Sequence, residues 1–187
     1  MIKLNRLITA SLFLSLLTLS AWSEDSSVIS GYEVGETTQS FTVVDVTGKY
    51  AGKRICYVCE YQDEPNVIGF FQTTGDETAD FITRMDELYK QNKERHLKAV
   101  AVIVAGQEAK PWLEQLNQEK NLEIPLVVLK KGPKDLAVRL YRLNPEVENT
   151  FLVNINRKVM ANVAGIDTDQ FSLVADATTR MLSDNNL

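Results

Sequence analysis

The sequence predicts one α/β domain built on a central mixed sheet with helices on both faces. Three short apolar runs, typical of strands that are covered on both sides, alternate with segments of helical periodicity. Such alternation indicates parallel strands joined by helices that pack across the sheet. Two further strand-like runs follow each other closely near the end of the chain, which predicts a hairpin that adds antiparallel strands.

The first expected elements are two strands and a long helix. The run 41–46 is rich in β-branched residues and ends at Thr47-Gly48, a turn signal. The run 66–71 is apolar almost throughout, as a strand buried on both faces is. Between residues 76 and 92 the apolar side chains recur on one face of a helix, namely Phe81, Ile82, Met85, Leu88 and Tyr89.

The alternation continues through the middle of the chain. The apolar runs 98–105 and 124–129 predict the second and third buried strands. Pro111 suits the first turn of a helix between them, because a proline at that position loses no helical hydrogen bond. A short helix is expected at 134–143.

The end of the chain predicts a hairpin and a final helix. The strand-like runs 149–155 and 158–164 are joined by only Asn156-Arg157. Apolar residues then recur on one side of the segment 168–182, which indicates an amphipathic helix.

The N-terminal segment has the pattern of an export signal. A basic start is followed by an apolar run over 7–19 and then by Ala21-Trp22-Ser23, with small residues at its two ends. We therefore expect a signal peptide at 1–23 and the globular domain at 24–187. The apolar run is shorter than the roughly 20 residues that span a bilayer, so no membrane attachment is expected after cleavage. The predicted location is the periplasm or the outside of the cell, where disulfides persist.

Composition narrows the possible functions. Hydrophobic residues make up 44% and charged residues 24% of the chain, which excludes a disordered or collagen-like protein. The net charge of −5 argues against a nucleic-acid partner, since such proteins present a basic face. The chain has no glycine-rich phosphate loop, and Glu60 rather than a haem-binding histidine follows the Cys-x-x-Cys motif. No bound cofactor is therefore expected.

The order of the expected elements resembles that of the thioredoxin superfamily. The likeness covers roughly residues 33–183 and includes the segments Asp45-Val46-Thr47-Gly48, Gly52-Lys53 and Thr150-Phe151-Leu152-Val153. The chain most resembles the redoxin branch, which comprises the alkyl hydroperoxide reductase and thiol-specific antioxidant-like proteins and periplasmic thioredoxin-like reductases. This resemblance implies a thioredoxin-like fold and, as partners, protein thiols or disulfides.

Two hallmarks of that superfamily are missing. Its reactive cysteine opens the helix after the first core strand, where the helix N-terminus lowers the pKa of the thiol. The corresponding turn here, Thr73-Thr74-Gly75-Asp76, has no cysteine, and we expect Thr74 or Asp76 to cap the helix. The superfamily's cis-proline precedes the first strand of the hairpin, where this chain has Glu148. A peroxiredoxin-type peroxidase is therefore not expected.

The two cysteines are the candidate catalytic residues. Cys56 and Cys59 have the spacing of a dithiol redox motif, but they lie upstream of the first core strand, with no helix start expected directly after them. If the pair is redox-active, the chain is an exported thiol–disulfide oxidoreductase. By analogy with other dithiol motifs, Cys56 would be the attacking thiol and Cys59 the resolving one.

Charged residues near the pair act in opposite directions. Positive side chains favour a thiolate, and two of them, Lys53 and Arg54, precede Cys56. Negative side chains disfavour a thiolate, and three follow Cys59 closely: Glu60, Asp63 and Glu64.

Two other interpretations of the pair stay open. It could form a structural disulfide in a non-catalytic thioredoxin-like binding module, where a loop of about four residues would contribute only about 2 kcal/mol of stability. It could also hold Cu(I), a soft ion that two thiolates can bind. The only histidine, His96, lies far along the chain at the end of the first long helix, and we expect it to be solvated surface rather than a ligand.

Overall fold

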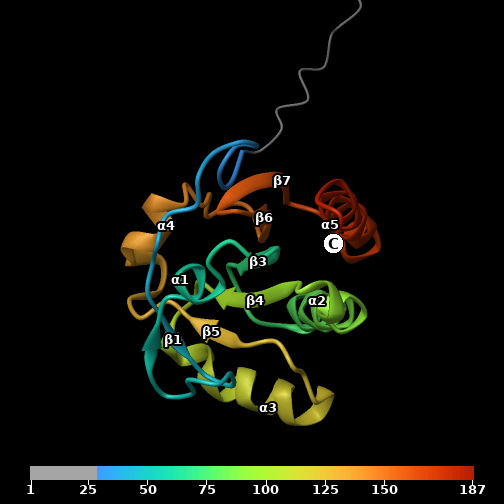
Figure 1. The fold of residues 1–187 in the computed structure, drawn as a ribbon. Helices are drawn as coiled ribbons and strands as arrows, with labels where there is room; N and C mark the ends of the chain where they lie inside the picture. The colour runs from blue at the N-terminus through green and yellow to red at the C-terminus, as the bar shows by residue number, and fades with distance from the viewer. Residues whose placement is uncertain (1–28) are drawn as a thin grey trace, which may run out of the picture.

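The fold is organised around one seven-stranded sheet. A computed structural model describes residues 29–187, so the expected signal peptide at 1–23 lies outside the described residues. The strands follow one another across the sheet in the order β2-β1-β5-β4-β3-β6-β7 (Figure 1). Their bounds are β1 Val43–Asp45, β2 Arg54–Ile55, β3 Asn66–Phe71, β4 Lys98–Ile103, β5 Leu126–Val128, β6 Asn149–Ile155 and β7 Lys158–Ala164.

Strands of both directions occur in this sheet. β4 lies in the middle and pairs in parallel with both β3 and β5, whereas the remaining pairs are antiparallel. β6 and β7 form the predicted hairpin, and its connection, Asn156 and Arg157, has positive φ at both residues. The prediction of a mixed sheet with a closing hairpin is confirmed.

Helices cover both faces of the sheet, as the sequence predicts. α2, α3 and α5 lie on one face, and α1 and α4 lie on the other (Figure 1). Their bounds are α1 Tyr57–Tyr61, α2 Asp76–Asn92, α3 Lys110–Lys120, α4 Leu136–Leu140 and α5 Ser172–Asp184. Within residues 29–187 no helix has the length and apolar character needed to cross a membrane.

Neighbouring residues of the central strands point into two different cores. In β3, Val67 and Phe71 belong to the core beneath α2, α3 and α5, whereas Ile68 and Phe70 belong to the core beneath α1 and α4. All six residues of β3 are buried. This burial on both faces is the reason why the segment is apolar almost throughout rather than at alternate positions.

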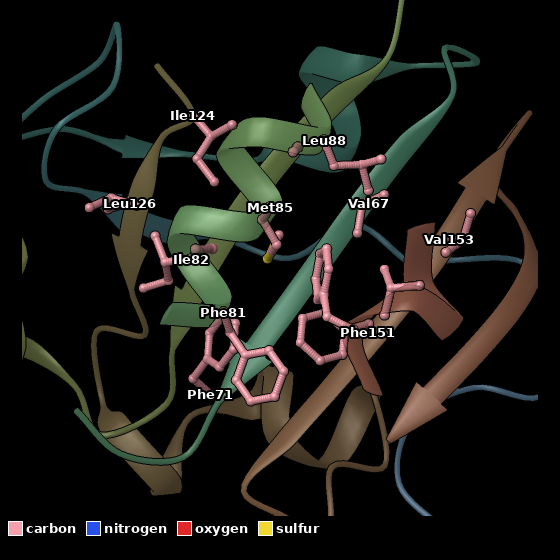
Figure 2. Packing of buried hydrophobic residues seen from close by; sticks show 14 of the residues in the cluster. Val67, Phe71, Phe81, Ile82, Met85, Leu88, Ile124, Leu126, Phe151 and Val153 are labelled. Atoms are coloured by element: carbon pink, nitrogen blue, oxygen red, sulfur yellow. The ribbon is translucent and has the colours of Figure 1, made fainter. Parts of the chain in front are cut away.

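Phenylalanine rings fill the core beneath α2 and α5. Phe151 of β6 is completely buried, and its ring centroid lies 5.3 Å from that of Phe81, 5.6 Å from that of Phe71 and 5.8 Å from that of Phe171. Figure 2 shows Phe71, Phe81 and Phe151 gathered between α2 and the sheet. These spacings are those of favourable tilted and edge-on aromatic pairs.

The structure differs from the sequence prediction in several short elements; for example, β1 and β5 are shorter than the runs 41–46 and 124–129. β2 and α1 were not expected, because two and five residues are too few to show a period. α4 is shorter than the expected 134–143. Its first turn begins only after Asp135, which takes an extended conformation and caps the helix by accepting the N–H of Ala137 at 3.2 Å.

The aromatic core generates a stability prediction. Phe151→Ala should lower the free energy of unfolding by about 3–5 kcal/mol, because it removes a fully buried ring and leaves a cavity among three others. The matched control is Leu173→Ala in α5, where the side chain is 49% exposed. Urea denaturation should place this control within about 0.5 kcal/mol of the wild type. An equal loss in both variants would contradict the assigned core.

Candidate functional site

The cysteine pair lies at the start of α1. Cys56 and Cys59 are joined in a disulfide, with their Cα atoms 5.2 Å apart. Cys56 is the N-cap of the helix, and its carbonyl oxygen accepts the N–H groups of Cys59 and Glu60. The helix therefore starts between the two cysteines, whereas the sequence predicted no helix start at this motif. Three of the helix's five residues are buried, so packing stabilises a helix that is too short to be stable alone.

The two sulfurs differ in their surroundings. Cys59 is exposed, whereas Cys56 is half-buried and packs against the core beneath α1 and α4. The N–H of Cys59 donates to Cys56 Sγ at 3.1 Å, and Cys59 Sγ lies 3.3 Å from the hydroxyl of Ser40. Cys59 is therefore the more solvent-exposed residue of the pair.

Two tyrosines fix α1 to the sheet. The hydroxyl of Tyr57 donates to Asp45 Oδ2 at 2.7 Å, and that of Tyr61 donates to the carbonyl oxygen of Ala99 at 2.7 Å. Burial raises the pKa of Tyr57 well above its usual range, and the carboxylate of Asp45 raises it further. Burial likewise raises the pKa of Tyr61. Both hydroxyls therefore remain protonated donors at neutral pH.

Asp45 joins the β1–β2 turn to α1. It is only 1% exposed, and it also accepts the N–H groups of Gly48 at 2.7 Å and Tyr50 at 2.8 Å. Gly48 has to be a glycine, because a Cβ atom there would lie 2.6 Å from the oxygen of Tyr57. The Asp45-Val46-Thr47-Gly48 segment thus positions the residue that directly follows Cys56.

Most of the acidic residues that follow the pair are engaged elsewhere. The carboxylate of Glu60 accepts a hydrogen bond from the hydroxyl of Tyr50 at 2.5 Å and lies 3.9 Å from the ammonium of Lys49. Glu64 pairs with Lys98 at 3.3 Å. These contacts reduce the negative charge that the sequence places near the sulfurs, although exposed pairs of this kind are individually weak.

The place where the thioredoxin superfamily keeps its reactive cysteine is occupied by a polar turn. Gly75 is the N-cap of α2, at φ 140°, and no side chain caps the helix. The expectation that Thr74 or Asp76 would do so was wrong, because the cap position has a backbone conformation that favours glycine. The Thr73 hydroxyl instead donates to the side chain of Glu148 at 3.2 Å.

This turn is far from the disulfide in the topology of the fold. It follows the carboxyl end of β3, whereas α1 leads into the amino end of the same strand. A cavity of about 130 Å³ is present at the turn, lined by residues that include Thr73, Gly75 and Glu148. It contains no sulfur atom, and residues 29–187 have no cis peptide bond. Both departures from the superfamily that the sequence indicates are therefore present in the fold.

The residues that sequence reasoning weighed as metal ligands do not form a cluster. His96 is exposed at the end of a short 3₁₀ helix that follows α2. Across the described part of the chain, no group of three or more histidine, cysteine, aspartate or glutamate side chains is placed to hold a metal ion.

The contacts of Asp45, Ser40 and Tyr57 were not predicted from the sequence. A signal was available for Asp45, because it is the one charged residue within the β-rich run 41–46. None existed for Ser40, whose approach to Cys59 depends on how distant segments pack.

The link between Asp45 and Tyr57 generates the next prediction. Tyr57→Phe keeps the ring but removes one of the three hydrogen bonds to a buried carboxylate. We expect a loss of about 1.5–3 kcal/mol in the free energy of unfolding, measured by urea denaturation. Tyr50→Phe is the control, because its hydroxyl bonds only the exposed Glu60. A Tyr57→Phe variant as stable as this control would show that the link is unimportant.

Comparison with known proteins supports the fold. No protein-family model matches the chain, and no curated protein matches its sequence. Solved structures do match. The peroxidoxin BcpB from Mycobacterium tuberculosis is 19% identical, with a TM-score of 0.63, over 80% of this chain and 97% of that one.

Two further structures are similar to this chain, a peroxiredoxin and a DsbE protein. Peroxiredoxin Q from Xanthomonas campestris is 10% identical, with a TM-score of 0.60, over 76% of this chain and 91% of that one. A proposed thiol:disulfide interchange protein DsbE from Chlorobium tepidum is 16% identical, with a TM-score of 0.60, over 78% of this chain and 98% of that one. Likeness at these identities establishes architecture rather than activity. The chain has the thioredoxin-like fold that peroxiredoxins and DsbE-like redoxins share.

Proposed function

We propose that this protein is an exported thiol–disulfide oxidoreductase that acts through Cys56 and Cys59. The observation that supports this most directly is the exposure of Cys59 in a disulfide at the start of α1. A fully buried disulfide could not be attacked by the thiol of another protein, whereas Cys59 of this pair is exposed to solvent. The fold that the chain shares with redoxins is consistent with protein thiols or disulfides as partners.

The reaction exchanges one disulfide for another. A thiolate of a partner dithiol attacks Cys59 Sγ and forms a mixed disulfide, the Cys56–Cys59 bond breaks, and Cys56 leaves as a thiolate that takes up a proton. The partner's second thiolate then attacks the mixed disulfide and releases Cys59, which is protonated in turn. The partner loses two electrons and two protons, and the protein gains them. A second partner, with a disulfide of its own, reoxidises the pair by the reverse steps.

In this proposal Cys59 forms the mixed disulfide with the partner. By analogy with other dithiol motifs, the sequence predicted that role for Cys56. Access decides which sulfur an external thiol attacks, and Cys59 is the more exposed of the two. The half-buried Cys56 is then the leaving and resolving thiol. The N–H of Cys59, already directed at Cys56 Sγ, would donate to the thiolate that is released there.

Export is part of the same proposal. The signal pattern at 1–23 would bring the domain to the periplasm or out of the cell, where an oxidised pair persists. Mass determination of the protein purified from a periplasmic extract should show cleavage after Ser23. A full-length protein in the cytoplasmic fraction would contradict this part.

Trapping of the mixed disulfide tests which cysteine reacts. In Cys56→Ser, the remaining Cys59 should form a stable adduct with oxidised glutathione. In Cys59→Ser, the half-buried Cys56 should react more slowly, by roughly tenfold or more, because access limits the attack. The rates are measured by intact-mass spectrometry on samples quenched with acid, with both variants first confirmed as folded by circular dichroism.

The opposite order of rates would show that Cys56 is the attacking thiol. The oxidoreductase proposal would be contradicted if neither variant formed an adduct with oxidised glutathione and a dithiol peptide did not reduce the wild-type disulfide. That result would favour the alternative, a non-catalytic binding module with a structural disulfide. The absence of a cysteine from the turn Thr73-Thr74-Gly75-Asp76, which opens α2, is the observation that favours this second candidate.

A further inference from the structure

A groove of about 290 Å³ runs beside the disulfide. It lies between the segment that leads into β1 and the segment around α4. Residues from both sides line it, including Ser40, Thr42, Arg54, Lys130, Lys131 and Leu136. Ser40 connects the groove to the cysteine pair, because its hydroxyl lies 3.3 Å from Cys59 Sγ.

The groove has an excess of positive charge on an acidic protein. Arg54, Lys130 and Lys131 are all exposed, and within residues 29–187 none of the three has a carboxylate oxygen within 4.0 Å. Asp135 also lines the groove, but its two oxygens are used by the N–H groups of Lys131 and Ala137. The whole chain has a net charge of −5, so a cluster of unpaired cations is opposite in sign to the net charge of the protein.

The groove also has an apolar part. Leu136, the first residue of α4, is 63% exposed, which is a large fraction for so large an apolar side chain. Phe41 and Leu140 line the groove beside it. Cationic side chains around an apolar strip suit a peptide that has acidic and apolar residues, rather than a small inorganic anion.

We infer that this groove binds the acidic segment next to the reactive cysteine of a substrate protein. The inference rests on the proposed function and specifies its substrate class. A peptide seated there would place its cysteine close to Cys59, because Ser40 belongs to both the groove and the surroundings of that sulfur. The unpaired cations would attract acidic substrates and repel basic ones, which acts mainly on the association rate.

Two dithiol peptides test the inference. Both have the same pair of cysteines, flanked by glutamates in one and by lysines in the other, and each is mixed with the oxidised full-length protein. Loss of the Cys56–Cys59 disulfide is followed by quenching and mass spectrometry. The acidic peptide should react faster at low salt, by roughly tenfold, and the difference should shrink as salt screens the charges.

Charge-reversed variants test whether the groove causes the preference for the acidic peptide. Lys130→Glu combined with Lys131→Glu should remove or invert the preference for the acidic peptide. Lys120→Glu combined with Arg180→Glu is the matched control, because it changes the net charge equally but lies in α3 and α5 on the other face of the sheet. All these residues are exposed, and thermal melting verifies that each variant is folded. Dithiothreitol attacks as a singly charged thiolate without charged flanking residues, so its rate should change much less between these variants than the rate of the acidic peptide.

The outcomes separate the inference from the function on which it rests. Reduction by dithiothreitol with equal rates for the two peptides would overturn the groove assignment and leave the oxidoreductase standing. If neither peptide reacts, binding of the fluorescent acidic peptide is measured by anisotropy, and loss of binding in the Lys130/Lys131 variant alone would still support the groove. Binding of these lysines to phosphatidylglycerol vesicles but not to the acidic peptide would overturn it in favour of a membrane surface.

Discussion

The buried carboxylate of Asp45 is the contact on which the position of the cysteines depends. A charge that is almost fully removed from water is tolerated only when hydrogen bonds replace its solvation. Two N–H groups of the β1–β2 turn and the hydroxyl of Tyr57 provide them. Because Tyr57 directly follows Cys56, the same carboxylate that shapes the turn also anchors the start of α1. The disulfide is thus held by the sheet edge rather than by the helix alone.

The sequence predicted the layers of this fold from its longest patterns. The run 66–71 and the helix at 76–92 are each long enough, and buried consistently enough, for their periodicity to be read directly. The strand and helix within 54–61 were not predicted, because tertiary contacts stabilise them. One such contact is the hydrogen bond from the hydroxyl of Tyr61 to the carbonyl oxygen of Ala99. Such contacts between distant segments cannot be predicted from the local sequence pattern.

The candidate site was predicted in part. Spacing alone identified Cys56 and Cys59, since a dithiol motif is local in sequence. Their unequal exposure was not predictable, because it results from packing of α1 over the second core, and neither was the approach of Ser40 from nineteen positions away. The groove beside them was missed for the same reason: Arg54 and Lys130 are far apart in the sequence and line one groove only in the folded chain.

If the pair exchanges disulfides as proposed, the thiol chemistry of this chain is at the start of α1, before β3, and not at the carboxyl end of that strand. The most direct test of this account is the reduction potential of the Cys56–Cys59 disulfide, determined by equilibrating the protein with glutathione buffers and alkylating the free thiols. An exchanging pair should have a potential near about −200 mV, whereas a value below about −300 mV, typical of structural disulfides, would contradict the account.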